Sequence, residues 1–426
     1  MARQRWVRGV ATVGMAAAAA LVAPAAPAGA VEVSTGAELT AAWSDPTVTE
    51  IVMTADVELG CEDRSRGPAF PPVVLDGQGH VATVNCTDAA LGGTTQTNGT
   101  MTLVDVGLIG PEADFSATLR GNTITLDGVH LMGRNDHSIV QHFGSTLRVT
   151  DSTIETQGAG LAVESDGDTR LERTRITGTG SGVFTSGGDQ PDALAIVDSS
   201  IDVAGAGVTT EQPTVIERSS IRGDLNTIST AGGDESVITD STLVVGVGID
   251  MPEGGAIRIA GATEVLFDQV TVVPDDPTVP GLVPAVRTIN SRLTVHASVL
   301  VGRTGQPVCV GPVLSEGDSV AGDDSCGLDG PGDQVIADGG LEAYDPDARF
   351  APPVVDGPLM DAVVDCTSTA DQRGEPRPSG PACDIGAIEI QVPEPPPGSS
   401  SSVPAGPPPA VAPPATPVAG PARFTG

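Results

Sequence analysis

The densest group of residues that could do chemistry lies in the middle of the chain, where two histidines precede two carboxylates. His137 and His142 are followed about one repeat later by Glu164 and Asp166. An imidazole beside carboxylates gains basicity, so it can act as a general base or bind a metal ion. These four residues are the candidate catalytic residues. The plainer interpretation, which we favour, is that they are solvated turn residues.

Two acidic loops that contain glycine offer oxygen ligands of the kind that Ca²⁺ prefers. They run over residues 164–168 and 316–324, and neither matches an EF-hand or the calcium-binding nonapeptide repeat. No Walker, GxGxxG, GxSxG or HExxH pattern occurs in a supporting context, so we predict no cofactor other than a candidate Ca²⁺ ion. The candidate Ca²⁺ ligands are Asp166, Asp168, Asp323 and Asp324.

Composition argues against a site that cleaves polysaccharides. Such sites stack sugar rings on aromatic side chains, and the 426 residues include only 2 Trp, 1 Tyr and 7 Phe. The sequence also contains no lysine, so a site that needs an Arg-x-Lys pair cannot be built. Carboxylates that hold Ca²⁺ beside an arginine base are still allowed. A polysaccharide lyase or glycoside hydrolase is therefore kept as the alternative function.

The elements that must position these residues are short strands, because one pattern recurs along the chain. Two aliphatic residues alternate with polar ones, a polar or Gly corner follows, and another aliphatic residue closes the unit. Alternation at two residues indicates strands, and closing residues spaced by 20 to 29 positions indicate a solenoid. The closing residues are Leu108, Leu131, Ile154, Ile176, Ile201, Ile221, Leu243, Val272 and Leu300.

A single unit of this kind buries too little apolar surface to offset the entropy lost on ordering it, so units must stack. The sequence therefore predicts an all-β fold, a single-stranded right-handed parallel β-helix with coils over residues 61–340. We expect Gly-rich segments such as residues 158–160 and 178–182 to supply corners with positive φ. A leucine-rich repeat shares the period, but its LxxLxLxxN signature is missing.

The first 30 residues have the features of a secretory signal peptide. Three arginines precede an apolar run over residues 10–22, and Ala28-Gly-Ala30 is a small-residue cleavage site. An uncleaved N-terminal anchor is the alternative. Residues 31–60 carry an N-terminal cap and the first strands, because the capping-box pattern Thr35-Gly-Ala-Glu38 opens a short helix. No later stretch reaches about 18 apolar residues, so we expect no transmembrane segment in the mature chain.

The formal net charge of -34 excludes nucleic acid as a partner, because such a surface repels polyanions. After residue 391 the composition becomes rich in Pro, Ala and Ser, which predicts a disordered tail over residues 392–426. Since caps would protect the strand edges at both ends of the stack, we expect a monomer.

Six cysteines, none of them in a CxxC pair, indicate disulfides in an oxidising compartment. The sequence alone cannot choose among the pairings. Proximity along the chain suggests Cys61–Cys86, Cys309–Cys326 and Cys366–Cys383.

Residues 371–389 open with Asp-Gln-Arg-Gly-Glu-Pro-Arg and end with Cys-Asp-Ile-Gly-Ala-Ile-Glu. This segment resembles the terminal motif of the bacterial secreted β-helix proteins called choice-of-anchor Q proteins. The stretch over 352–356, the pair Cys366 and Cys383, and residues 31–39 are also similar to theirs. The resemblance implies a surface or extracellular β-helix whose C-terminal part completes the stack, and it implies no reaction.

The charged residues of this motif are interpreted as a polar C-terminal cap within residues 341–391, in preference to a catalytic group. They are Asp371, Arg373, Arg377, Asp384 and Glu389.

Taken together, the sequence favours an exported structural, surface or adhesive β-helix without catalytic activity. We expect it to be secreted or held at the cell surface after signal-peptide cleavage. Its expected partners are a cell-wall or extracellular polysaccharide, or another surface protein.

Overall fold

A computed structural model of the chain describes residues 30–60, 64, 70–84, 91, 99–110, 119–134, 137–186, 193–228, 235–245, 257–261, 264–278 and 283–391. The chain divides into two units, Met1–Ile390 and Gln391–Gly426. The predicted signal peptide and tail lie outside the described residues, except for Ala30, and so do Cys61 and Cys86.

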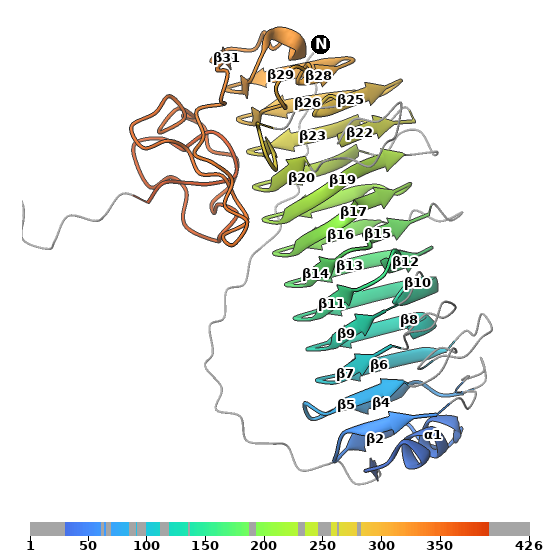
Figure 1. The fold of residues 1–426 in the computed structure, drawn as a ribbon. Coiled ribbons are helices and arrows are strands. Elements are labelled where there is room, and N and C mark those ends of the chain that lie inside the picture. Colours follow the sequence, from blue (N-terminus) through green and yellow to red (C-terminus); the bar gives the residue numbers. More distant parts are fainter. Residues whose placement is uncertain are drawn as a thin grey trace, which may run out of the picture. The chain divides into compact units, whose positions relative to one another are not determined.

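The first unit is a right-handed parallel β-helix of about ten turns, and its strands stack into three sheets (Figure 1). All the strand pairings are parallel, so each strand bonds to the equivalent strand of the next coil. This arrangement confirms the predicted fold.

The first sheet contains β1 (Val31–Val33), β2 (Glu50–Met53), β4 (Val73–Asp76), β6 (Thr100–Val104), the second halves of β8 (Leu119–Asp127) and β10 (Val140–Thr150), β13 (Asp168–Glu172), β16 (Leu194–Val197), β18 (Thr214–Glu217), β20 (Glu235–Thr239), β23 (Glu264–Asp268), β26 (Arg292–His296) and β29 (Val313–Gly317).

The second sheet contains β3 (Val57–Leu59), β5 (Val81–Val84), β7 (Gly107–Ile109), β9 (His130–Gly133), β11 (Thr153–Thr156), β14 (Arg175–Gly178), the first halves of β17 (Ser200–Thr210) and β19 (Ser220–Ile228), β21 (Thr242–Val245), β24 (Thr271–Pro274), β27 (Val299–Leu300), β30 (Val320–Ala321) and β31 (Gln334–Val335).

The third sheet contains the first halves of β8 and β10, then β12 (Leu161–Ser165), β15 (Ser181–Thr185), the second halves of β17 and β19, β22 (Ile257–Ala260), β25 (Val286–Ile289) and β28 (Cys309–Val310).

The predicted closing aliphatic residues form one column inside the second sheet. Ile154 pairs with Leu131 on one side and Ile176 on the other, and the register continues to Leu300. All nine residues of the column are at most 2% exposed. The sequence period therefore gives the correct register, since a slip of one residue would turn every aliphatic side chain outward.

The corner between the first and second sheets is built from residues in the left-handed region. Their φ values lie between 44° and 65°, and most are not glycine. Asp is common among them, because its short polar side chain tolerates this conformation. They are Asp105, Gly128, Asp151, Arg173, Asp198, Arg218, Asp240, Gln269, Ala297 and Asp318.

The prediction that the Gly-rich segments supply corners with positive φ was wrong for most of their glycines. Among the glycines of residues 158–160 and 178–182, only Gly178 has positive φ. Gly160, Gly180 and Gly182 are required instead by the close approach of neighbouring coils. A Cβ on Gly160 would lie 2.1 Å from the carbonyl oxygen of His137, and one on Gly180 would lie 2.1 Å from that of Gly160.

A ladder of buried hydroxyls follows the corner residues. The Ser219 hydroxyl accepts from the backbone N–H of Ser199 at 3.1 Å and donates to the Glu217 carbonyl at 2.8 Å. Ser241 repeats this pattern one coil later, accepting from the N–H of Ser219. Each hydroxyl thus satisfies backbone groups that the corner removes from the sheets.

The N-terminal end of the stack carries the predicted helix, α1 (Gly36–Ser44). Thr35 and Glu38 form the capping box, and Leu39 and Trp43 are fully buried in the core. A short 3₁₀ helix, η1 (Asp324–Cys326), lies near the other end. In the described part of the chain, no helix is long and apolar enough to cross a membrane.

Residues 341–390 pack against the outer face of the second sheet (Figure 1). Their Leu359 and Ile385 contact Val299 and Val320, whose side chains point away from the core of the β-helix. A Cys366–Cys383 disulfide closes this segment, which we call the C-terminal cover.

Candidate functional site

The structure separates the residues of the predicted catalytic group. His142 is fully buried inside the coil. Its Nδ1 lies 2.7 Å from the Ser165 hydroxyl and its Nε2 lies 2.6 Å from the Asn122 carbonyl oxygen. A Cβ on Gly167 would lie 1.8 Å from the Gly144 carbonyl oxygen and 2.9 Å from the imidazole, so only glycine fits at this position.

Glu164 lies on the opposite face of the same sheet. It pairs in register with Gln141, and His142 pairs with Ser165, so the two-residue alternation turns the carboxylate outward and the imidazole inward. Its Oε2 accepts from Ser138 at 2.6 Å and from Gln141 at 3.0 Å.

The other candidates of this region have separate environments. Asp166 accepts a hydrogen bond from the Ser186 hydroxyl at 2.5 Å. His137 and Asp168 are exposed.

The candidate Ca²⁺ ligands near the C-terminal end serve local structure. Asp323 accepts from the N–H of Ser325 as the N-cap of η1, and from the N–H of Val308. Asp324 lies in the first turn of η1. Within the described ranges, no three His, Cys, Asp or Glu side chains group closely enough to share a metal ion.

Two of the three predicted disulfides are present. Cys309–Cys326 joins β28 to η1, and Cys366–Cys383 lies in the C-terminal cover.

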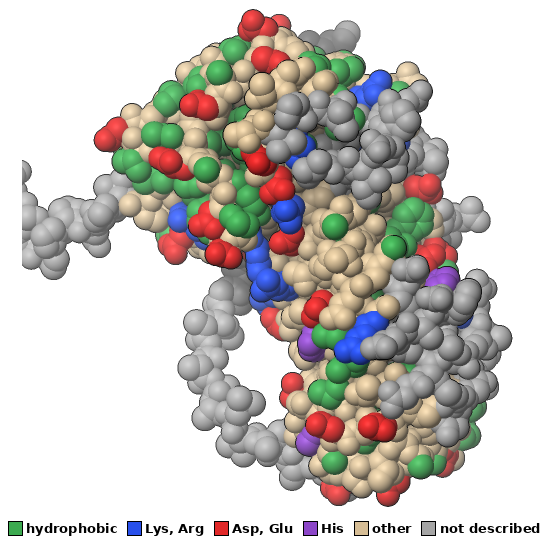
Figure 2. All heavy atoms as spheres, in the orientation of Figure 1, with side chains coloured by type: hydrophobic (Ala, Val, Ile, Leu, Met, Phe, Trp, Pro, Cys, Tyr) green, Lys and Arg blue, Asp and Glu red, His purple; other side chains and the backbone are tan. Residues whose placement is uncertain are grey.

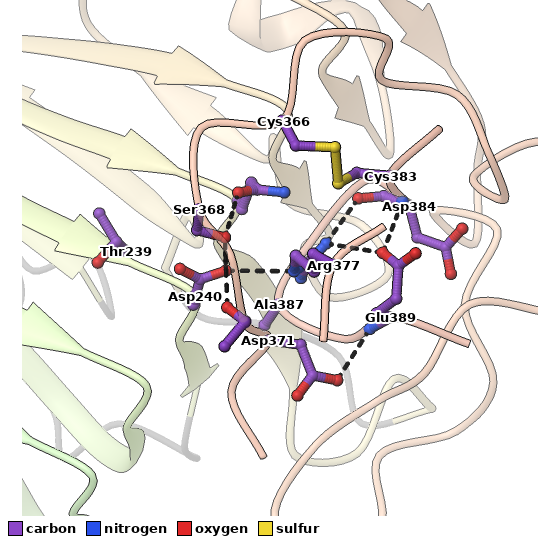
Figure 3. Close-up of polar contacts among 12 residues, drawn as sticks. Thr239, Asp240, Cys366, Ser368, Asp371, Arg377, Cys383, Asp384, Ala387 and Glu389 are labelled. Atoms are coloured by element: carbon purple, nitrogen blue, oxygen red, sulfur yellow. Dashed lines mark hydrogen bonds and ion pairs between the residues drawn. A yellow bond between two sulfur atoms is a disulfide. The ribbon is translucent and has the colours of Figure 1, made fainter. Parts of the chain in front are cut away.

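Four of the five charged residues of the C-terminal motif, Asp371, Arg377, Asp384 and Glu389, lie together in the cover (Figure 3), and Arg373 joins them through Asp371. The side chain of Arg377 is fully buried. Its guanidinium donates to the carbonyl oxygens of Asp384 and Gly386, and lies 3.3 Å from the Glu389 carboxylate.

The remaining carboxylates of the motif bind backbone N–H groups. Asp371 accepts from the N–H of Glu389 and forms an ion pair with Arg373. Asp384 accepts from the N–H groups of Asp361 and Ile390. These contacts hold the motif together internally. The motif itself lies against the outer face of the second sheet.

One carboxylate of the β-helix joins this cluster. Asp240, a corner residue, lies 3.4 Å from Arg377 Nε and accepts from the Ser368 hydroxyl at 2.9 Å (Figure 3). Burial raises the pKa of Asp240 to about 7, and Arg377 only partly opposes this effect. Burial also raises the pKa of Glu389, which shares the same arginine.

Two other corner aspartates pair with the corner arginine of the next coil. Arg173 binds Asp151 through two N–H groups, and Arg218 binds Asp198 in the same way. The corner following Asp240 carries the neutral Gln269, so the counter-charge of Asp240 comes from the C-terminal cover instead.

A cleft of about 300 Å³ lies where the cover meets the second sheet. Figure 2 shows basic side chains gathered at this border on a surface that is otherwise rich in acidic and uncharged groups. Its walls include Ser200 and Asp198 from the β-helix and Phe350 from the cover. The arginines that line it are Arg173, Arg175, Arg218, Arg349 and Arg373.

Sequence reasoning identified only Arg373 among these arginines, and assigned it to the cap. Arg175 carried a usable signal. It precedes the closing aliphatic Ile176, where the neighbouring repeats have Thr153, Ser200 and Ser220. Arg349 carried none, because the cover lies outside the repeat.

Residues 30–189 match a family model described as "Putative pectate lyase-like adhesive domain". This part of the chain is therefore similar to adhesive β-helix domains. The match and the two disulfides are consistent with an extracellular location. No curated protein matches the chain.

Two solved structures are distantly similar. One is the catalytic domain of a GH87 α-1,3-glucanase in complex with tetrasaccharides, with 14% identity, a TM-score of 0.34, and coverage of 74% of this chain and 69% of that chain. The other is the SRRP of L. reuteri 53608, with 13% identity, a TM-score of 0.25, and coverage of 72% and 94%. Neither similarity is close enough to bear on function.

Proposed function

We propose that the protein is an exported adhesive β-helix that binds an extracellular polysaccharide or a surface protein without chemical turnover. The observation that carries this proposal is the arginine-lined cleft at the border of the cover. Its arginines offer several N–H donors in fixed geometry, which is the chemistry of recognition. The adhesive-domain match of residues 30–189 supports the same function.

The scaffold suits adhesion for a physical reason. Stacked parallel coils form a stiff rod, in which each coil is held by its neighbours through backbone hydrogen bonds. A rod of this kind displays a binding surface away from the point of attachment. We propose that the signal peptide directs export and that the tail holds or spaces the rod at the cell surface.

The test is binding of the purified chain to immobilised extracellular polysaccharides, whole cells and surface proteins. Saturable binding without release of reducing or unsaturated sugar ends is the expected result. Absence of binding to every surface would contradict an adhesive function.

A polysaccharide lyase is the second candidate, and Arg349 is the observation that favours it. Burial and the nearby charge of Arg175 lower the pKa of Arg349, the direction that favours the neutral guanidine, which is the form of the side chain that can accept a proton. The check is release of unsaturated ends from acidic polysaccharides with and without Ca²⁺. Release of unsaturated ends by the parent chain that disappears in Arg349→Gln would establish lyase activity and contradict the proposal of binding without turnover.

A further inference from the structure

Two arginines of the cleft are not neutralised by a carboxylate. Arg175 and Arg349 have no ion pair within 4.0 Å in the part of the chain that the structure describes. Arg349 donates from Nη1 to the Ser200 hydroxyl at 2.7 Å, which fixes the direction of its guanidinium. Asp202, the acidic residue that acts on Arg349, is bound by Arg222 at 2.8 Å.

The other arginines of the cleft are held in place by acidic partners. Arg173 is bound by Asp151, and Arg373 by Asp371 while it lies over the ring of Phe350. These groups form fixed walls and leave two positive charges facing the cleft.

The two arginines of the cleft suit an oxyanion as ligand. A guanidinium binds a carboxylate or sulfate with charge-assisted hydrogen bonds, and Ser200 and Ser220 add hydroxyl groups to the cleft wall. The volume of about 300 Å³ is at the small end of ordinary ligand sites, so the cleft takes one small charged group with its immediate surroundings.

The charge around the cleft limits the ligand further. The chain has a net charge of -34, and Asp198 itself lines the cleft. A densely charged polyanion would bring most of its charges against this acidic surface and be repelled. A ligand with a single negative group on an otherwise uncharged chain would meet the two arginines and avoid that repulsion.

We propose that this cleft binds the carboxylate of a terminal acidic sugar carried by an otherwise neutral glycan. This inference rests on the proposed adhesive function and assigns it a site and a ligand class. Arg175 and Arg349 clamp the carboxylate, and the serine hydroxyls contact the sugar. Polyuronates and nucleic acids are excluded by repulsion.

The experiment is calorimetric titration of the full chain with sialyllactose, lactose, 3′-sulfolactose and polygalacturonate. Sialyllactose should bind, and lactose and polygalacturonate should bind at least about 10-fold more weakly, the loss expected when a charged hydrogen bond is missing or opposed. Arg175→Gln and Arg349→Gln should each weaken sialyllactose binding about 10-fold or more.

Arg292→Gln is the matched control, because Arg292 is an exposed arginine on the first sheet whose ion pair with Glu264 is also exposed. It removes the same charge and should leave binding unchanged. Circular dichroism of each variant confirms that the fold is retained.

The outcomes separate this inference from the proposed function. Sialyllactose binding that survives both cleft variants, tighter binding of polygalacturonate, or binding of 3′-sulfolactose alone would each overturn the assignment of the cleft. None of these results would remove adhesion. A chain that adheres to no surface at all would instead contradict the proposed function itself.

Discussion

The carboxylate of Asp240, at a corner of the β-helix, lies 3.4 Å from Arg377 Nε, which belongs to the C-terminal cover. The same buried arginine also neutralises Glu389. One positive charge therefore serves two buried carboxylates, and the pair retains a proton more readily than isolated carboxyl groups would.

The first prediction concerns pH. The pKa of Asp240 is about 7 in the folded chain against 3.8 as its ordinary value, so the folded state binds more protons between these values. The free energy of unfolding should fall as pH rises from about 4 to about 7, by up to roughly 1.4 kcal/mol per pH unit. Denaturant unfolding at several pH values measures this slope.

Asp240→Asn should reduce that slope, whereas Asp347→Asn should not, because Asp347 is exposed. An unchanged slope in Asp240→Asn would show that Asp240 is not the group that takes up the proton.

The second prediction compares two arginines that each face a corner aspartate. Arg377→Gln leaves Asp240 and Glu389 buried without a counter-charge, so it should destabilise the fold by about 3–5 kcal/mol. Arg218→Gln breaks a half-exposed pair with Asp198 and should cost about 1 kcal/mol or less. Equal losses in thermal unfolding experiments would contradict the central position of Arg377.

The third prediction tests the register of the second sheet. Ile154→Asp places an unpaired charge in the buried column between Leu131 and Ile176, and should cost more than about 4 kcal/mol. Thr153→Asp, one residue away on the outer face, should be tolerated. Native melting and circular dichroism in Ile154→Asp would show that the register is wrong.

The fourth prediction concerns the hydroxyl ladder. Ser219→Ala removes the acceptor of the Ser199 N–H inside the corner, so stability should fall by about 1–3 kcal/mol. Ser145→Ala, at an exposed position where the hydroxyl contacts that of Thr123, should change stability by less than about 0.5 kcal/mol. A Ser219→Ala chain as stable as the parent in denaturant would show that the ladder contributes little.

The fifth prediction concerns the cover. The Cys366→Ser, Cys383→Ser double variant opens a loop with a sequence separation of 17, which should destabilise the cover by roughly 3 kcal/mol. Limited proteolysis should then cut within residues 341–390 while the β-helix keeps its circular dichroism. Protection equal to that of the parent chain would show that packing on the sheet is sufficient.

The repeat could be predicted from the sequence because the register of a solenoid follows directly from the spacing of its buried residues. Each coil buries an aliphatic residue at the same place, so the period of Ile154, Ile176 and Ile201 is also the stacking of the strands. The helix at the N-terminus could be predicted from the capping box of Thr35 and Glu38, because that signal lies within a few residues.

The environment of the site could not be predicted in the same way. The contact between His142 and Ser165, and the outward direction of Glu164, depend on which residue of a strand pairs with which, a difference of one position. The cleft depends on Arg349 meeting Ser200, 149 positions earlier in the chain. No local pattern encodes that distance, since the cover has no repeat of its own.

The cover also sets an order of events during synthesis. Val244, Val273 and Val299 lie on the outer face of coils that are complete before residues 341–390 have emerged. Until the cover is made and docks, these valines remain in contact with water. A chain truncated before the cover would expose an apolar strip that promotes aggregation. Docking of the C-terminal cover thus marks the point at which a newly made molecule no longer exposes an apolar surface that could aggregate with other copies of the chain.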